Sequence, residues 1–461
     1  MKQALPLYLS EPALICACGR GRDALWQAVT QADNSAIRDC RTAEGSRNFP
    51  AALVAENDLL PAGSCVALDV ASCVAPDFAP GIAQDKTSRA FDPATKLVRM
   101  EQTALADLDG TLAAALNRYG PDRIAVLVGS CDNASETSLS GHRQFFQEGA
   151  FPAGYTLARQ GAQAVSAAVR ERYGLRGPAV SCASACSSSA AAVVKAAQLI
   201  RGGIADAVIV GGADLASDLV LLGFASMECI SPAATNPFSR NRSGITLGEA
   251  AAFFLLAKDR FVTDGPAVTL AGYGESADAY HITSPDPSGA GAASAMRQAL
   301  RSAGIGPQEL GYINLHGTGT KLNDAMEARA VAAVTGGAVP CSATKSVTGH
   351  TLGAAGALSL AVCYETLVRN AGTIATGNTN AIATGGADAG AGGSTGVPDI
   401  LLPAQAWDGE YDEELPRLNI IGKENNRLSP RGGSLRYCMS NSFGFGGANV
   451  SIILQLEAGH A

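Results

Sequence analysis

Short apolar runs alternate with alanine-rich segments along most of this chain, and this rhythm limits what the chain can fold into. The runs at 123–130, 206–217 and 251–259 are almost continuously apolar, as strands are when other layers cover both of their faces. Segments rich in alanine and other helix formers lie between such runs. The alternation therefore predicts an α/β fold with mainly buried strands.

The same rhythm restarts near residue 265. A new apolar run begins there, and an alanine-rich segment at 289–304 and a further run at 311–320 follow it. We interpret the restart as two similar halves packed on each other, residues 1–264 and 265–461. The halves show no visible sequence repeat, so this division rests on topology alone.

Composition excludes several classes of function. The 34 Lys and Arg against 42 Asp and Glu give a net charge of −8, so the chain has no basic footprint for nucleic acid. No run of 18 apolar residues is present, and Glu11 and Pro12 interrupt the apolar stretch near the N-terminus. We therefore expect no signal peptide, no membrane span and a cytoplasmic location.

Twelve cysteines are scattered through apolar and small-residue contexts, without a CxxC pair and a matching distal pair. This spacing is not that of a structural zinc site, and we expect no metal. We interpret most of the cysteines as small buried residues in a reduced compartment.

Cys186 differs from the other cysteines because it lies between an apolar run and an alanine-rich helical segment. A thiol at a helix N-terminus faces the positive end of the helix dipole and free backbone N–H groups. Both features favour the thiolate, which is the nucleophilic form, and the N–H groups could form half of an oxyanion hole. The alternative interpretation is a structural buried cysteine.

His316 and His350 lie in turns rich in Gly and Thr, and the chain has only five histidines. A thiol with two imidazoles can hold a thioester carbonyl and assist carbanion formation at the adjacent carbon. Glu327 and Lys345 lie nearby in the sequence, and as a pair they would orient His316 and set its tautomer. The alternatives are ordinary polar histidines in turns and a surface salt bridge of little value.

The segments around these residues resemble the motifs of one family. The chain is similar, over nearly its whole length, to the β-ketoacyl-ACP synthases, the elongating condensing enzymes of the thiolase superfamily. The similarity is carried by ACSSS at 185–189, SADAYHITSPDP at 276–287, NLHGTGTKLNDAME at 314–327, ATKSVTGHTLGAAGA at 343–357 and NSFGFGGAN at 441–449.

This resemblance implies a thiolase-like fold, in which two related halves form five α/β/α/β/α layers, usually in a dimer. It also implies decarboxylative Claisen condensation of an acyl thioester with malonyl-ACP. The substrates would be carried on the phosphopantetheine of an acyl carrier protein, and the enzyme would need no cofactor of its own. Its partner subunit would be a second copy or a chain-length factor.

The motifs also imply roles for single residues. Cys186, in the N-terminal half, would take the acyl group. His316 and His350, in the C-terminal half, would bind the malonyl thioester carbonyl, and Lys345 and Glu327 would organise the site.

Further residues would shape the substrate path. The backbone N–H groups of Cys186 and Phe445 would form the oxyanion hole, with Phe445 also acting as a gate. Thr318, Thr320 and Phe443 would contact the pantetheine arm.

Two positions depart from many fatty-acid enzymes of this family, which have Pro where this chain has Lys321 and often Gly where it has Asn323. The opening PLYLSEPALICACG also lacks their Gly-rich first strand. In these features the chain looks more like the synthases of bacterial aryl polyene pigment clusters. The rival classes are a thiolase, which uses two cysteines and CoA substrates, and a non-catalytic chain-length factor. The family motifs argue against the first, and Cys186 argues against the second.

Overall fold

The computed structural model of the chain describes residues 5–42, 47–61, 91–132, 135–261, 265–371, 399–428 and 435–457. Its first strands are β1 (Tyr8–Leu9), β2 (Ala13–Cys16), β3 (Gly19–Arg20), β4 (Ile37–Arg41), β5 (Asn48–Ala52), β6 (Ile124–Gly129), β7 (Ala179–Cys182), β8 (Ala207–Asp214), β9 (Leu247–Gly248) and β10 (Ala250–Ala257). The later strands are β11 (Val268–Ala277), β12 (Leu310–Asn314), β13 (Cys341–Ser342), β14 (Ile400–Leu401), β15 (Arg427–Leu428), β16 (Tyr437–Gly444) and β17 (Ala448–Leu456). The α-helices are α1 (Arg22–Gln31), α3 (Lys96–Leu105), α4 (Asp109–Tyr119), α5 (Ser135–Glu148), α6 (Gln163–Arg172), α7 (Ser188–Arg201), α8 (Asp218–Ser226), α9 (Ala290–Ala303), α10 (Lys321–Thr335), α11 (Lys345–Thr348) and α12 (Ala355–Arg369).

Most of the described strands belong to one large sheet, and the two ends of this sheet repeat one arrangement of strands. At one end β6 lies between β7 and β8 and is parallel to both, and β10 pairs with β8 antiparallel. At the other end β12 lies parallel between β13 and β16, and β17 pairs with β16 antiparallel. Strand β1 joins the two ends, because it pairs with both β10 and β11. The predicted fold of two related halves is confirmed, whereas the division at residues 264 and 265 stays a prediction.

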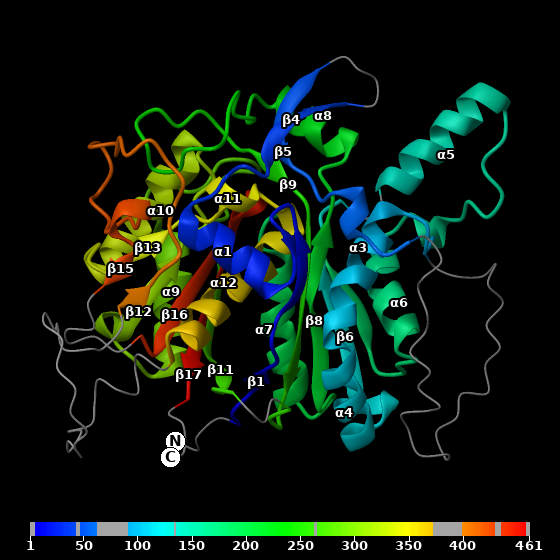
Figure 1. Cartoon of the computed structure of the whole chain (residues 1–461), viewed down its shortest axis with the longest axis horizontal. Coiled ribbons are helices and arrows are strands. Elements are labelled where there is room, and N and C mark those ends of the chain that lie inside the picture. The colour runs from blue at the N-terminus through cyan, green and yellow to red at the C-terminus, as the bar shows by residue number, and fades with distance from the viewer. Residues whose placement is uncertain are drawn as a thin grey trace, which may run out of the picture.

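Buried side chains on both faces of the sheets arrange the helices in layers. Neighbouring residues of a strand point to opposite faces. Thus Val208 of β8 and Ile452 of β17 enter a central core with α7 and α12. Ile209 packs on the other face with α3 and α6, and Ile453 packs with α9 and α10. The result is the succession of helices and sheets in Figure 1, with α7 and α12 in the middle.

Helix α12 is the most buried helix of this central layer. Its Gly356 lies flush against α7, since a Cβ there would come within 2.7 Å of the amide nitrogen of Ala190. The stretch Leu352–Arg369 has the length and composition of a membrane span, but 89% of it is buried inside the protein. Its apolar character therefore reflects its central position between the two sheets.

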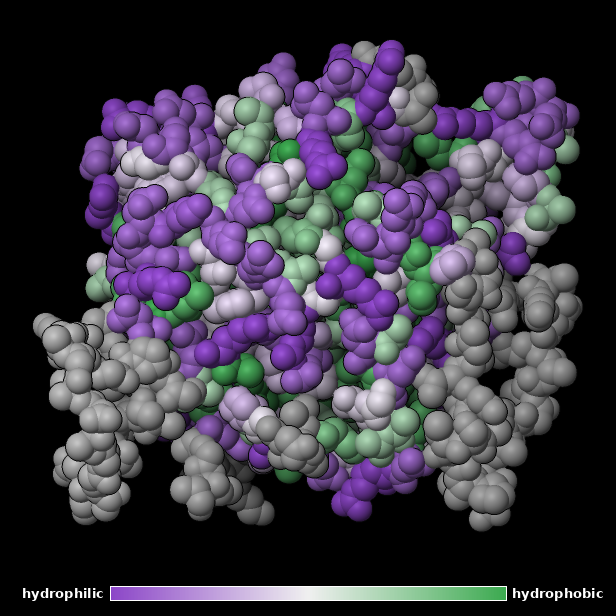
Figure 2. Space-filling view, viewed as in Figure 1, coloured by the Kyte–Doolittle hydropathy of each residue, from purple (hydrophilic) through white to green (hydrophobic). Residues whose placement is uncertain are grey.

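Helix α5 stands away from the rest of the molecule (Figure 1), and Gly141 is its one buried residue. The rings of Phe145, Phe151 and Tyr155 stack, with centroids 4.6 and 4.5 Å apart, and Phe146 is 82% exposed. Figure 2 shows that the visible face is otherwise largely hydrophilic, with hydrophobic patches between polar residues. An exposed aromatic cluster of this kind is typical of an interaction surface.

Candidate active site

Cys186 lies in the tight connection between β7 and α7, which begins at Ser188 as predicted. The preceding residue, Ala185, has the left-handed backbone angle φ of 49°, which is costly for a residue with a Cβ. The hydroxyl of Ser188 holds this turn, because it accepts from the amide of Ser184 at 2.9 Å and donates to the carbonyl of Ala185 at 2.6 Å. The turn presents the thiol to the centre of the molecule.

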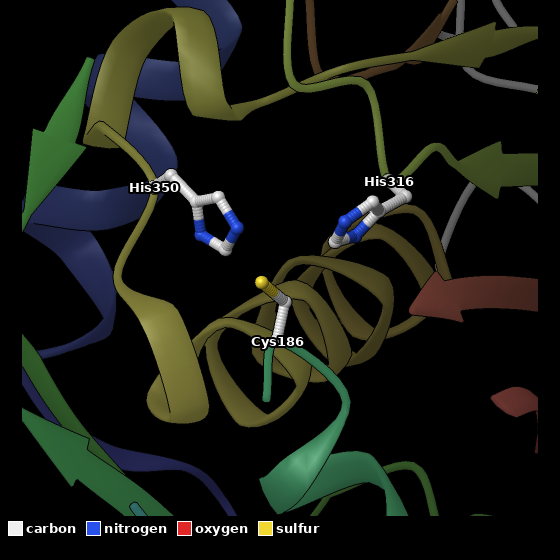
Figure 3. A group of neighbouring side chains, drawn as sticks. All are labelled: Cys186, His316 and His350. Carbon is white, nitrogen blue, oxygen red and sulfur yellow. The ribbon is translucent and has the colours of Figure 1, made fainter. Parts of the chain in front are cut away.

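The structure brings Cys186, His316 and His350 together from three distant segments. Their thiol and imidazole atoms all lie within 4.8 Å of one another. All three residues are buried, with exposed fractions of 5%, 1% and 1%. Figure 3 shows the sulfur between the two rings, which are perpendicular and have centroids 5.5 Å apart. The predicted cluster is therefore formed, and the catalytic roles of its members stay predictions.

Lys345, at the start of α11, fixes His316. Its ammonium nitrogen donates to the carbonyl oxygen of His316 at 2.5 Å and lies 3.4 Å from the Nδ1 of the same residue. An ammonium group only donates, so Nδ1 accepts and the ring proton sits on Nε2. Burial lowers the pKa of Lys345, and the negative charge of Glu327 opposes that shift.

Glu327 holds the backbone of His316 and does not pair with Lys345. Its carboxylate oxygens accept from the amides of His316 and Gly317, each at 2.7 Å. Within the described residues, no ion pair joins Glu327 to Lys345. The predicted pairing is therefore wrong in its detail, because both groups instead bond His316 and its neighbour. The alternative of a surface salt bridge is also wrong, since both side chains are buried.

Asp324 lies one helical turn before Glu327 in α10 and supports the same loop. Its carboxylate accepts from the amides of Thr318 and Gly319 at 3.1 and 3.2 Å and from the amide of Phe238 at 2.9 Å. Burial raises the pKa of this carboxyl to about 6, although the amides favour its ionised form. The two acidic side chains of α10 thus hold four successive backbone amides of the loop, those of residues 316–319.

His350 is fixed by a different route. Its Nδ1 accepts from the amide of Leu352 at 3.1 Å, so the proton again sits on Nε2. That Nε2 atom is buried and has no hydrogen-bond partner in the protein. Burial lowers the pKa of His316 and of His350 well below the usual value, and the charge of Lys345 lowers both further. Both rings are therefore neutral, and each carries an Nε2–H donor.

Opposing effects act on the Cys186 thiol. Burial raises its pKa to about 11, although the charge of Lys345 and the amide N–H groups of Phe445 and of Cys186 itself lower it. Burial thus opposes the thiolate that the helix N-terminus favours, and the thiolate stays a prediction. The same two amides are those that the sequence resemblance placed in the oxyanion hole, and both reach the sulfur.

A thiol and two imidazoles at this spacing are also a possible set of metal ligands. The ammonium of Lys345 lies beside them and opposes a divalent cation at this position. We therefore retain the metal-free interpretation as a prediction.

A cavity of about 130 Å³ is lined by the Gly-rich turn at 443–447. Of the predicted pantetheine residues, Thr320 and Phe443 line it, as does the gate residue Phe445. Thr318 is buried behind the wall and bonds the hydroxyl of Thr320 at 3.0 Å. The residues that depart from the family pattern, Lys321 and Asn323, also line this cavity, together with Asp278, Thr283, Ser284 and Pro285 of the 276–287 segment.

The turn that carries Phe443 and Phe445 packs on the nucleophile. A Cβ at Gly444 would lie 2.9 Å from the carbonyl oxygen of Ser184, so only glycine allows this approach. The ring of Phe445 stacks on Phe224 of α8 with centroids 5.9 Å apart. Phe445 thus lines the cavity while its amide acts on the thiol of Cys186, and its role as a gate stays a prediction.

Sequence reasoning missed Asp214, at the end of β8. Its buried carboxylate accepts from the hydroxyl of Ser130 at 2.6 Å, from the amides of Cys131 and Asp132 at 2.9 Å, and from the amide of Gly353. Burial raises its pKa to about 7. This carboxylate joins the loop after β6 to the loop after His350. An acidic residue that ends an apolar strand was the available signal in the sequence.

Comparison with known proteins places these features in one family. The model of the β-ketoacyl synthase N-terminal domain matches residues 15–260, and that of the C-terminal domain matches residues 267–374. A 3-oxoacyl-[acyl-carrier-protein] synthase 2 from Vibrio cholerae is 30% identical over 362 residues, which cover 74% of this chain and 77% of that protein. The match to the corresponding synthase of Coxiella burnetii is 34% identical and spans 63% of this chain and 64% of that protein.

Solved structures show the same relationship. The ketosynthase ApeO in complex with its chain length factor ApeC, from Xenorhabdus doucetiae, matches with a TM-score of 0.78 and 31% identity over 98% of both chains. A β-ketoacyl synthase from Burkholderia phymatum shares the fold, with a TM-score of 0.72 and 23% identity over 98% of this chain and 100% of that one. The chain therefore belongs to the β-ketoacyl synthase family, the class of condensing enzymes that its motifs predicted.

Proposed function

We propose that the chain extends an acyl group held on Cys186 by decarboxylative condensation with malonyl-ACP. The observation that carries this proposal is the pair of neutral imidazoles beside one buried thiol. Each ring has a proton on Nε2, and the Nε2 of His350 has no partner in the protein. Such donors stabilise negative charge on a thioester oxygen better in a dry site than in water.

In the first half-reaction, the sulfur of Cys186 attacks the carbonyl carbon of an acyl thioester on the carrier protein. The new C–S bond replaces the bond to phosphopantetheine, whose sulfur leaves with the proton of the thiol. The amides of Cys186 and Phe445 both lower the pKa of this thiol, and as donors beside the sulfur they would stabilise the tetrahedral oxyanion.

In the second half-reaction, the Nε2–H groups of His316 and His350 donate to the thioester oxygen of malonyl-ACP. Loss of CO2 leaves the electron pair on the adjacent carbon as an enolate, and both donors stabilise its oxygen. This carbon attacks the acyl thioester on Cys186, and the Cys186 sulfur departs and takes up a proton. Lys345 contributes by positioning His316 and by keeping both rings neutral.

The carrier protein would deliver both substrates through the 130 Å³ cavity. Thr320, Phe443 and Phe445 line this path, and it ends at the turn that covers Cys186. We expect no cofactor beyond the phosphopantetheine of the carrier protein, and a cytoplasmic location.

A partner subunit of the same fold would cover the outer edge of the sheet. In the described part of the chain, β7 pairs only with β6, so its other edge is open, and Val180 on it is 45% exposed. The aromatic cluster of Phe145, Phe146, Phe151 and Tyr155 extends from the same half of the molecule. A second copy or a chain-length factor fits this surface, and the similarity to the ApeO–ApeC complex supports the second option.

The pathway proposal is an aryl polyene or fatty-acid-like synthesis, supported by the opening segment and by the departures at Lys321 and Asn323. A thiolase is disfavoured because, within the described residues, the cluster of reactive groups holds one thiol and two imidazoles. A chain-length factor is disfavoured because Cys186 is present in a complete cluster.

The proposal is tested by mixing the purified protein with an acyl carrier protein that bears an acyl chain and with malonyl-ACP. We expect β-ketoacyl-ACP and one CO2 for each product, both measured by mass spectrometry with labelled malonyl groups. Condensation of two acyl-CoA molecules without release of CO2 would instead establish a thiolase.

A further inference from the structure

The hairpin of β2 and β3 carries two cysteines that the proposed reaction does not use. Cys16 ends β2 and pairs with Gly19 of β3, so that Ala17 and Cys18 form the turn between the strands. Cys16 is buried in the central core, and the partly exposed Cys18 packs against the same core. Both side chains therefore lie on one face of the hairpin.

The two thiols are in contact. The thiol of Cys18 donates to the sulfur of Cys16, which also accepts from the backbone amides of Cys18 and Gly19. The bond from the Cys18 thiol lowers the pKa of Cys16, burial opposes that shift, and the two amides add to it. Donors that converge on one sulfur favour its thiolate, which is the form that reacts with oxidants.

The spacing of these cysteines suits a disulfide. Cα atoms two positions apart in a turn are about 5–6 Å from each other, which is within the range that a disulfide spans. Both cysteines are free in the structure, and their thiols already point toward each other. Disulfides in a reduced compartment are usually transient and redox-sensing, so a reversible bond fits this pair better than a permanent one.

The hairpin adjoins the segment that holds His350. Cys16 pairs with Ala250, the first residue of β10. The residues just before β10 bond His350 on both of its sides. The carbonyl of Thr246 accepts from the amide of His350 at 2.7 Å, and the amide of Gly248 donates to the carbonyl of His350 at 3.0 Å. A movement of the turn is therefore transmitted through Ala250 to the backbone of a predicted catalytic residue.

We infer that Cys16 and Cys18 form a reversible disulfide, and that this bond loosens the segment that holds His350. The oxidant is a peroxide: the sulfur of Cys16 attacks one of its oxygens and becomes a sulfenic acid, and the other oxygen leaves as water. The sulfur of Cys18 then attacks the sulfur of Cys16 and displaces a second water. Two thiols and one hydrogen peroxide thus give one disulfide and two waters. The amides of Cys18 and Gly19 lose the thiolate that they bonded, which destabilises the turn.

The first experiment treats the purified protein with hydrogen peroxide and maps the products by mass spectrometry after digestion. We expect a Cys16–Cys18 disulfide, seen as a loss of about 2 Da from the peptide, and its reversal by dithiothreitol. Cys18→Ser should lack this bond, whereas Cys40→Ser, at another partly exposed cysteine, is the matched control and should form it. Absence of the bond in the wild-type protein overturns the inference, as does oxidation of Cys16 to a sulfinic or sulfonic acid instead.

Hydrogen exchange then measures the effect on His350. In the oxidised wild-type protein, the amides of Gly248 and His350 should exchange at least about tenfold faster than in the reduced protein. Peroxide-treated Cys18→Ser, or Cys18→Ala if the serine variant does not fold, should keep the slow exchange. Unchanged exchange in the oxidised wild-type protein overturns the link to His350. Neither experiment uses a substrate, so the inference goes beyond the proposed function and does not depend on it.

The consequence for the proposed function is a slower second half-reaction, because a displacement of about 1 Å at a catalytic group can cost about 10²-fold in rate. Release of CO2 from malonyl-ACP should fall at least about tenfold on oxidation and return with dithiothreitol. Treated Cys18→Ser should keep its rate, which separates this effect from oxidation of Cys186. An unchanged rate in the wild-type protein, or an equal fall in Cys18→Ser, overturns the regulation. If the untreated protein releases no CO2, the proposed function fails, whereas mapping and exchange still decide the inference.

Discussion

The ammonium nitrogen of Lys345 lies 3.4 Å from the Nδ1 of His316 and bonds the carbonyl oxygen of the same residue at 2.5 Å. One buried lysine thus fixes both the backbone and the tautomer of a predicted catalytic histidine. Its charge also lowers the pKa of the thiol of Cys186 and of both imidazoles. Lys345 therefore connects all members of the cluster electrostatically.

Replacing Lys345 should separate the two half-reactions. In Lys345→Met, the Nε2–H of His316 is no longer held toward the substrate, so decarboxylation of malonyl-ACP should slow by about 10²–10³-fold. Loading of Cys186 should slow less, because its oxyanion donors are backbone amides. The measurement compares CO2 release with acyl transfer, and Lys195→Met, at a half-exposed surface ion pair, is the control. Decarboxylation at the wild-type rate in Lys345→Met would remove the lysine from the mechanism.

The raised pKa of Cys186 predicts how its alkylation depends on pH. A pKa of about 11 means that the thiol keeps its proton at neutral pH, and that the reactive thiolate increases with pH up to that value. The rate of iodoacetamide labelling at Cys186 should therefore rise about tenfold for each pH unit from 7 to 10. Site-resolved mass spectrometry measures the rate. A plateau below pH 8 would show that the free enzyme holds a thiolate.

Glu327 tests the contribution of the loop after His316. In Glu327→Gln, an NH2 group replaces one carboxylate oxygen, so the backbone amide of His316 or of Gly317 would lose its acceptor. An unsatisfied buried donor costs about 1–3 kcal/mol, so the free energy of unfolding should fall by that amount. Urea denaturation measures the change, and Glu424→Gln, at an exposed position, is the control. Unchanged stability would mean that the loop does not depend on this carboxylate.

Much of the arrangement was visible in the sequence, because apolar runs and Gly turns determine local structure. The runs that became β6, β8 and β10 predicted the layered fold, and the motifs around Cys186, His316 and His350 predicted a shared site. The desolvation that opposes a thiolate at Cys186 was not visible, because it depends on how distant segments cover a residue. The pairing of Lys345 with Glu327 failed for a related reason, since their preferred partners are backbone groups that only the fold brings near.

Two further features were not visible in the sequence. Asp214 joins loops more than 220 positions apart, from Ser130 to Gly353, and no local pattern encodes that contact. The exposed face of α5 was also missed, because its sequence resembles that of an ordinary amphipathic helix. Exposure of an aromatic face becomes apparent only when the surrounding elements are placed.

The aromatic face of α5 predicts an effect on assembly. Phe146 is 82% exposed, so Phe146→Glu should leave the unfolding temperature unchanged while it places a charge in the proposed interface. Light scattering after gel filtration should show a dimer for the wild-type protein, either a homodimer or a heterodimer with a chain-length factor. The Phe146→Glu variant should be a monomer in the same measurement. Ile204 is also exposed but lies just after the C-terminus of α7. Ile204→Glu is therefore the control and should remain dimeric. An unaffected dimer in Phe146→Glu would place the interface elsewhere.

The central claim is that Cys186 carries the acyl group while His316 and His350 activate malonyl-ACP. The most direct measurement is intact-protein mass spectrometry of Cys186→Ala, His316→Ala and His350→Ala after incubation with acyl-ACP, followed by addition of malonyl-ACP. We predict that both histidine variants gain the acyl mass and retain it, whereas Cys186→Ala gains none. Acylation of Cys186→Ala, or normal elongation in both histidine variants, would contradict the account.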